Sequence, residues 1–167
     1  LCPAHLRPAI VAIYHFARQA DDLADEGDAS SHERLAALAA FRADLHACVA
    51  LAPLSERWAE IFIPLAAVIK RHQLPVALLD DLITAFEQDV RYTAQGRWYA
   101  NHQGLFDYAQ HSANPVGRLL LHLYGVQGEQ ALRESDAICT ALQLINFWQD
   151  LSVDLPRQRY YLPLDLL

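Results

Sequence analysis

Apolar positions repeat with helical spacing over most of this chain. In residues 3–26, for example, Ile10, Ile13 and Ala17 recur three or four positions apart, so that they share one face of a helix. Glycine and proline are sparse and mostly gather between such stretches, and no alternation of β-branched residues lasts four positions. The pattern predicts an all-α protein, a single-domain helical bundle with short connections.

The interruptions of this pattern predict where the helices begin and end. We expect Ser31 and Ser55 to be the N-caps of the second and third helices. Pro64 should kink the third helix or divide it into two short pieces. Residues 114–117, Asn-Pro-Val-Gly, should bend or interrupt the fifth. The expected helices cover about residues 3–26, 31–52, 55–72, 75–93, 104–125 and 129–154.

Composition and charge narrow the class of protein. A hydrophobic content of 53% excludes disorder, and 13 Lys and Arg against 20 Asp and Glu argue against a nucleic-acid-binding surface. The three cysteines are far apart, which indicates reduced thiols in a cytoplasmic protein. No segment approaches the roughly 18 apolar residues that span a bilayer. Because Met is absent and residues 162–167 are apolar, we interpret residues 1–167 as one partial domain, truncated at both ends.

Two polar stripes carry the candidate chemistry. Asp21 and Asp25 are four residues apart, and Asp150 and Asp154 repeat this spacing near the other end of the chain. Chance alone gives about one such pair in a chain of this composition, so the spacing by itself is weak evidence for a functional site. The evidence becomes stronger because other polar residues lie on the same face of each helix. These faces comprise Tyr14, Arg18, Asp21 and Asp25 on the first helix and Gln143, Asn146, Asp150 and Asp154 on the last.

The stripes allow two interpretations. Solvated outer faces are the usual location of charged helix residues and would leave a helical interaction module. Facing each other inside the bundle, the carboxylates would instead suit Mg²⁺, which takes oxygen ligands while bridging to phosphates and assists the departure of diphosphate. Arg18 would then donate to phosphate oxygens, and nearby aromatic rings would stabilise a carbocation. The absence of Glu-x-x-His excludes a di-iron site, and the scattered His and Cys residues argue against a zinc site.

Three segments resemble conserved motifs of the squalene/phytoene synthase family. Residues 14–26 (YHFARQADDLADE) resemble its first aspartate-rich motif and residues 143–154 (QLINFWQDLSVD) its second. Residues 159–163 (RYYLP) resemble the stretch that follows the second motif, although Gln158 stands where the family usually has Gly between two Arg. The resemblance covers nearly the whole chain in the right order.

Within the family, residues 86–92 and 112–122 are most similar to the hydroxysqualene synthases of the bacterial hopanoid route. This resemblance implies an isoprenoid synthase fold and a Mg²⁺-dependent reaction. Presqualene diphosphate ionises, its cation rearranges, and water quenches it to hydroxysqualene. Head-to-head condensation of prenyl diphosphates, as in squalene, presqualene diphosphate and phytoene synthases, stays open as an alternative. A lipid substrate is also compatible with peripheral membrane association of a cytoplasmic protein, and the oligomeric state is left open.

The resemblance also implies roles for individual residues. The family has a Ser-containing motif before this segment and further helices after it. Asp21, Asp25, Asp150 and Asp154 would hold Mg²⁺ and, with Arg18 and Asn146, form the catalytic set. The residues expected to bind substrate are Tyr14, Phe86, Tyr108, Ser112, Val116, Gly117, Gln143, Gln149, Arg159 and Tyr161.

Overall fold

The computed structural model describes residues 2–166, and every regular element in that range is helical, which confirms the all-α prediction. Three single-turn 3₁₀ helices, at Glu56–Trp58, Leu155–Arg157 and Leu164–Leu166, accompany the α-helices. The α-helices are α1 (Arg7–Asp25), α2 (Ser31–Ala50), α3 (Ala59–His72), α4 (Val76–Gln95), α5 (His102–Ala109), α6 (Asn114–Leu123), α7 (Glu129–Gln149) and α8 (Leu151–Asp154).

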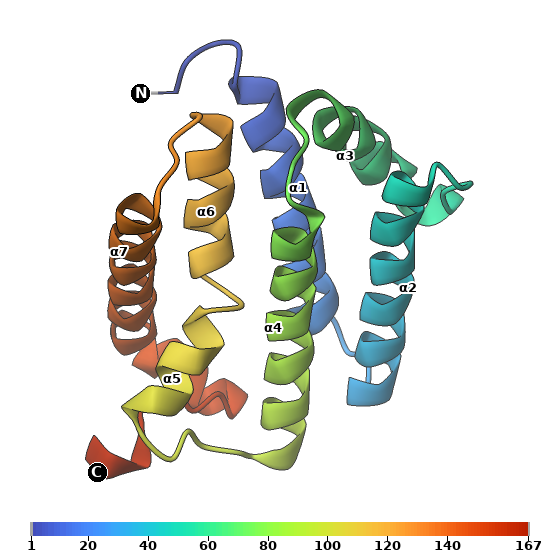
Figure 1. Cartoon of the computed structure of the whole chain (residues 1–167). Coiled ribbons are helices and arrows are strands. Elements are labelled where there is room, and N and C mark those ends of the chain that lie inside the picture. Colours follow the sequence, from blue (N-terminus) through green and yellow to red (C-terminus); the bar gives the residue numbers. More distant parts are fainter. Residues whose placement is uncertain (1, 167) are drawn as a thin grey trace.

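Helix α4 is the central element of the bundle. It packs against α1 and α2 on one side and against α6 on the other (Figure 1). Helices α1, α2 and α3 contact one another, whereas α7 packs against α5 and α6. The two ends of the chain that carry the acidic stripes are therefore brought to the two sides of α4.

The larger hydrophobic core lies among α1 to α4. Phe16, Phe41 and Phe62 are completely buried there, one each from α1, α2 and α3. Their rings are in contact, with centroids 5.1 Å apart for Phe16 and Phe41 and 4.6 Å apart for Phe41 and Phe62. Aromatic rings of this size dominate core energetics, so this cluster holds α1, α2 and α3 together.

A second and smaller cluster holds the end of the chain. It contains Tyr99, Leu105, Tyr108, Phe147 and Tyr161. The rings of Phe147 and Tyr161 stack with their centroids 3.8 Å apart and their planes inclined by 4°. This contact attaches the segment that follows α8 to α7, and so returns that segment to the centre of the bundle.

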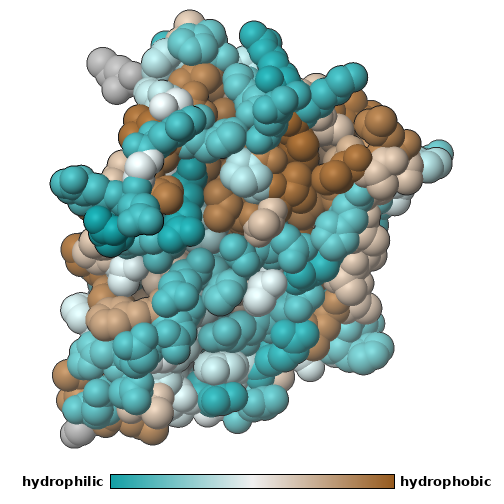
Figure 2. Space-filling view, viewed as in Figure 1, coloured by the Kyte–Doolittle hydropathy of each residue, from teal (hydrophilic) through white to brown (hydrophobic). Residues whose placement is uncertain are grey.

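Apolar surface is distributed unevenly over the molecule. On α7 the only buried residue is Phe147, while Ile138 is 61% and Leu142 55% exposed. In the view of Figure 2, hydrophobic surface gathers in the upper part of the molecule, where α3 and the start of α4 lie, and the lower part is mainly hydrophilic. Within residues 2–166, no helix is both long enough and apolar enough to cross a bilayer.

The prediction that Ser31 caps α2 is wrong, because Ser30 does so. The Ser30 hydroxyl oxygen accepts from the backbone N–H of Glu33 at 3.3 Å, and the Ser30 N–H donates to the Glu33 carboxylate at 2.8 Å. This reciprocal pair is a capping box, which requires Ser and Glu three positions apart. Counting from Ser31 would have placed Arg34 at that position, where no acceptor is available.

Pro64 does not divide the third helix, because α3 continues through it from Ala59 to His72. Pro64 is exposed, whereas Phe62 and Leu65 beside it are buried against the core and hold the helix together. The change of geometry comes earlier, where a 3₁₀ turn precedes α3. Ser55 makes no side-chain cap there, since its hydroxyl donates to Asp44 instead.

Two other predicted helices are each divided. The fifth is interrupted between α5 and α6, and Asn114 and Pro115 begin α6, where a proline lacks only an N–H that has no helical partner. The sixth ends at Gln149, and after Asp150 the short helix α8 follows. The last break lies within the second acidic stripe, at Asp150.

Candidate functional site

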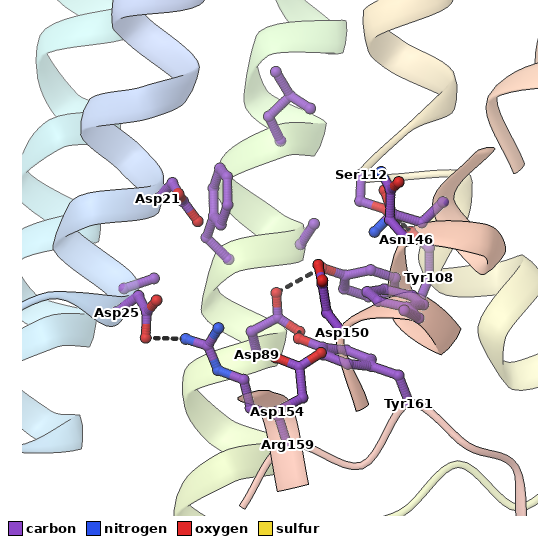
Figure 3. Close-up of a pocket in the computed structure, with 16 residues that line it drawn as sticks. Asp21, Asp25, Asp89, Tyr108, Ser112, Asn146, Asp150, Asp154, Arg159 and Tyr161 are labelled. Carbon is purple, nitrogen blue, oxygen red and sulfur yellow. Dashed lines mark hydrogen bonds and ion pairs between the residues drawn. The ribbon is translucent and has the colours of Figure 1, made fainter. Parts of the chain in front are cut away.

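A cavity of about 270 Å³ lies between α1, α4, α5, α7 and the segment after α8 (Figure 3). The four aspartates of the two stripes all line it, so the stripes share one space rather than two separate outer faces. Its lining comprises Asp21, Ala24, Asp25, Leu82, Ala85, Phe86, Asp89, Tyr108, Ser112, Gln143, Asn146, Phe147, Asp150, Asp154, Arg159 and Tyr161.

The first acidic pair, on α1, is held by arginines. Arg18 donates to the Asp21 carboxylate at 2.9 Å, and Asp25 accepts from Arg157 at 3.2 Å and also from Arg159. Burial raises the pKa of the Asp21 carboxyl even though the Arg18 guanidinium opposes this shift. Both carboxylates of the pair on α1 are therefore engaged by guanidinium groups at the cavity wall.

The second acidic pair keeps its one-turn spacing across the break after α7. The backbone N–H of Asp150 donates to the Asn146 carbonyl at 3.0 Å, and the N–H of Asp154 donates to the Asp150 carbonyl at 2.9 Å. Asp154 is 9% exposed, and burial raises the pKa of its carboxyl, whereas Asp150 is exposed at the side of the cavity. Asp150, the residue before α8, and Asp154, the last residue of its single turn, thus present their carboxylates to the same space.

Asp89 on α4 is a cavity residue to which the sequence analysis assigned no role. It accepts hydrogen bonds from the Tyr108 hydroxyl at 2.5 Å and from the Tyr161 hydroxyl at 3.0 Å. Burial raises the pKa of the Asp89 carboxyl to about 7. Helical spacing could have revealed it, because Leu82, Phe86 and Asp89 recur at intervals of four and three on the face of α4 that lines the cavity.

Gln158 lets both neighbouring arginines reach Asp25. Its φ of 59° lies in the left-handed region, which glycine adopts without the strain that a side chain brings. This is the position where the chain departs from the family pattern of Gly between two Arg. The turn directs Arg157 and Arg159 to the same carboxylate from a segment more than 130 residues further along the chain.

Five of the residues expected at the site lie outside the cavity lining. Tyr14 is 61% exposed on α1, and Val116 is 40% exposed on α6. A Cβ added to Gly117 would lie 2.5 Å from the Cys139 sulfur, so the space at this glycine is used for packing α6 against α7. The roles of these residues toward a substrate stay predictions. The five are Tyr14, Arg18, Val116, Gly117 and Gln149.

The donor set of the cavity suits Mg²⁺. Among residues 2–166, no three His, Cys, Asp or Glu side chains lie close enough together to hold a metal ion by themselves. Mg²⁺ does not require such a cage, because it keeps several waters and binds through one or two carboxylates together with substrate phosphates. Carboxylates converge here from two sides, and burial raises the pKa of Asp21 and Asp154, so a divalent cation would offset the confined negative charge.

Known proteins resemble the chain over its whole length. The family model described as squalene/phytoene synthase matches residues 1–167. A hydroxysqualene synthase of Zymomonas mobilis is 38% identical over 96% of this chain and 51% of its own length. A hydroxysqualene synthase of Sinorhizobium fredii is 36% identical over 99% of this chain and 52% of its own length. The chain thus spans about half the length of these curated relatives.

A solved structure shows the same arrangement of helices. Squalene synthase HpnC from Alicyclobacillus acidocaldarius is 38% identical and superposes with a TM-score of 0.83. The match covers 96% of this chain and 57% of that chain. With motifs, fold and cavity in agreement, the chain belongs to the squalene/phytoene synthase family.

Proposed function

We propose that the protein containing this chain is a Mg²⁺-dependent enzyme that ionises presqualene diphosphate. Water then quenches the rearranged cation, which gives hydroxysqualene and diphosphate. The observation that carries this proposal is the convergence of four aspartates, from the two ends of the chain, on one cavity that also contains Arg159. The relatives named hydroxysqualene synthase, at 36% and 38% identity, support the choice of reaction within the family.

The carboxylates and arginines form the diphosphate end of the proposed site. Asp21 and Asp25 would hold Mg²⁺ from α1, and Asp150 and Asp154 would hold it from the opposite side. Bound Mg²⁺ would supply the electrophile that draws electrons toward the departing diphosphate. Arg159 presents a planar fork of donors that fits phosphate oxygens, and it would exchange its bond to Asp25 for such oxygens.

The aromatic side chains form the hydrocarbon end of the site. Phe86, Tyr108, Phe147 and Tyr161 line the cavity, and the electron-rich faces of such rings attract a positive charge. The polar side chain of Asn146 lies on the same lining and offers a hydrogen-bonding partner to a water molecule. Attack by this water on the cation forms the C–O bond of the alcohol and releases one proton.

Head-to-head condensation of prenyl diphosphates is the second candidate. It is favoured by the solved relative, a squalene synthase at 38% identity, and by a presqualene diphosphate synthase of Zymomonas mobilis at 30% identity. The mass of the product separates the candidates. An alcohol of squalene indicates capture by water, a C30 hydrocarbon indicates reduction, and a C40 product indicates phytoene formation.

Release of pyrophosphate by the whole protein tests the proposal. With presqualene diphosphate and Mg²⁺ we expect release, and we expect its loss when a chelator removes the metal. Asp21→Ala and Asp150→Ala should abolish release while circular dichroism shows an intact helical fold. Glu129→Ala is the matched control, because this carboxylate is 91% exposed and does not line the cavity. Release at the wild-type rate by both Asp variants would instead support a helical interaction module.

A further inference from the structure

Asp89 lines the cavity but belongs to neither aspartate pair. Figure 3 shows its carboxylate at the lower centre of the cavity, with Asp21 and Asp25 on one side and Tyr108 and Tyr161 on the other. We propose that Asp89 is a positioning residue, which accepts hydrogen bonds from the hydroxyls of Tyr108 and Tyr161 and so leaves both phenol oxygens able only to accept hydrogen bonds at the cavity wall.

The hydrogen-bonding capacity of each group supports this assignment. Above its pKa of about 7 the Asp89 carboxyl is ionised and only accepts, whereas a phenol has one proton to donate and lone pairs with which to accept. The Tyr108 hydroxyl lies 2.5 Å from one Asp89 oxygen and the Tyr161 hydroxyl 3.0 Å from the other, so each phenol commits its proton to a different oxygen. Neither phenol then has a proton left to donate to a ligand in the cavity.

Packing holds the rings of the two tyrosines in place, so Asp89 can determine only the direction of each hydroxyl proton. The Tyr161 ring stacks on Phe147, and the Tyr108 ring contacts Phe147 with centroids 5.8 Å apart. Tyr108 is 5% and Tyr161 7% exposed. Since the rings are held by these contacts, only rotation about each C–O bond remains, and the carboxylate determines where each proton points.

The consequence is a division of the cavity by charge. Phenol oxygens polarised by a carboxylate attract positive charge and repel phosphate, so the wall at Tyr108 and Tyr161 suits the hydrocarbon cation. Arg159 lies between this wall and Asp25, and its charge favours the ionised form of Asp89 while burial opposes it. This inference rests on the proposed function, because it assigns the two phenols to the cation and not to the diphosphate.

The chain offers a matched control for a purely structural role. Asp44 is also buried, at 6% exposure, and its carboxylate also accepts two hydrogen bonds, from the N–H and the hydroxyl of Ser55. It lies outside the cavity lining. Asp89→Asn and Asp44→Asn therefore make the same chemical change in two buried sites, only one of which contains the tyrosines.

Steady-state kinetics of the whole protein test the inference. We expect Asp89→Asn to lower kcat on the order of 100-fold and to change KM by less than about threefold. Asp89→Glu should recover part of the loss because it restores the charge. Asp44→Asn should lower only the stability and leave the kcat of the folded protein unchanged. A kcat of Asp89→Asn that falls no further than that of Asp44→Asn would overturn the inference.

Nuclear magnetic resonance provides a readout that is independent of activity. In protein labelled with ¹³C at the tyrosine ring carbon that bears the hydroxyl, Tyr108→Phe and Tyr161→Phe assign the two signals. Donation to a carboxylate shifts such signals toward the phenolate value, so Asp89→Asn should move both back toward the value of free tyrosine. Signals that do not move overturn the inference even if the enzyme is active. Absence of pyrophosphate release by the wild-type protein rejects the proposed function instead and leaves this spectroscopic test decisive for Asp89.

Discussion

The two hydrophobic clusters of this bundle bury different kinds of side chains. The larger one, among α1 to α4, centres on Phe16, Phe41 and Phe62, which have no polar atoms and no exposed surface. The smaller one, around the end of the chain, contains tyrosines whose hydroxyls are bonded to Asp89. The first cluster holds the shape of the molecule, and the second positions polar groups at a cavity. Substitutions should therefore affect stability mainly in the first and site geometry mainly in the second.

The sharpest test of this comparison is a pair of phenylalanine substitutions. Phe41→Ala should lower the free energy of unfolding by about 3–5 kcal/mol, because it empties a site with complete burial and three aromatic neighbours. Phe147→Ala should cost about 2 kcal/mol, since its surroundings border a cavity and can relax into it. Urea unfolding followed by circular dichroism measures both. Equal losses would contradict the contrast between the clusters.

A second test concerns the close approach of α6 and α7. Gly117→Ala should lower the free energy of unfolding by about 2 kcal/mol, because the new methyl would meet the Cys139 sulfur at 2.5 Å and the Ser135 hydroxyl still closer. Adding Ser135→Ala and Cys139→Ala removes both atoms and should recover much of the lost free energy of unfolding. Thermal unfolding of the single and triple variants measures this recovery. A triple variant that is no more stable than Gly117→Ala would refute the steric explanation.

A third test uses the pKa of Asp89, which is about 7 in the folded protein against an ordinary value of 3.8. The folded state therefore binds the proton more strongly than the unfolded state. The stability that this proton provides is present below about pH 4 and is lost as the pH rises through about 7. The difference between wild type and Asp89→Asn in free energy of unfolding should change by about 4 kcal/mol across this window, since each unit of pKa difference corresponds to about 1.4 kcal/mol. A difference that does not vary with pH would show that the carboxyl titrates normally.

A fourth test separates function from stability at the acidic wall. Asp21→Asn should leave the free energy of unfolding unchanged or raise it by up to about 0.5 kcal/mol, since burial raises the pKa of this carboxyl and its partner Arg18 is half exposed. The same variant should lose Mg²⁺-dependent pyrophosphate release in the whole protein. Chemical denaturation without metal gives the first quantity. A loss above about 1 kcal/mol would make Asp21 a structural residue.

The smallest effect is expected on the surface of α7. Arg133 and Glu129 form an ion pair in which the side chains are 70% and 91% exposed. Arg133→Ala should change the free energy of unfolding by less than about 0.5 kcal/mol, because water and salt screen such pairs. Denaturation at low and high salt measures it. A larger change would indicate that this helix face makes contacts that its exposure does not suggest.

Much of the fold was accessible from local sequence pattern. Helical spacing of apolar residues predicted the all-α class and the approximate extent of the helices, because this spacing reports the period of the helix itself. The errors fell at single residues. Ser30 and not Ser31 caps α2, and the last helix breaks at Asp150, since helix ends depend on individual backbone hydrogen bonds and not on an average pattern.

The sequence by itself determined that Asp21 and Asp25 present two carboxylates one turn apart, because that distance depends only on the helix that contains both. Only the tertiary structure decided what the two acidic pairs face. Asp89 receives its hydrogen bonds from tyrosines 19 and 72 positions further along the chain, and Asp25 receives Arg159 from 134 positions away. Such partners follow from how α4 packs between the two ends of the bundle, and no local periodicity carries that information.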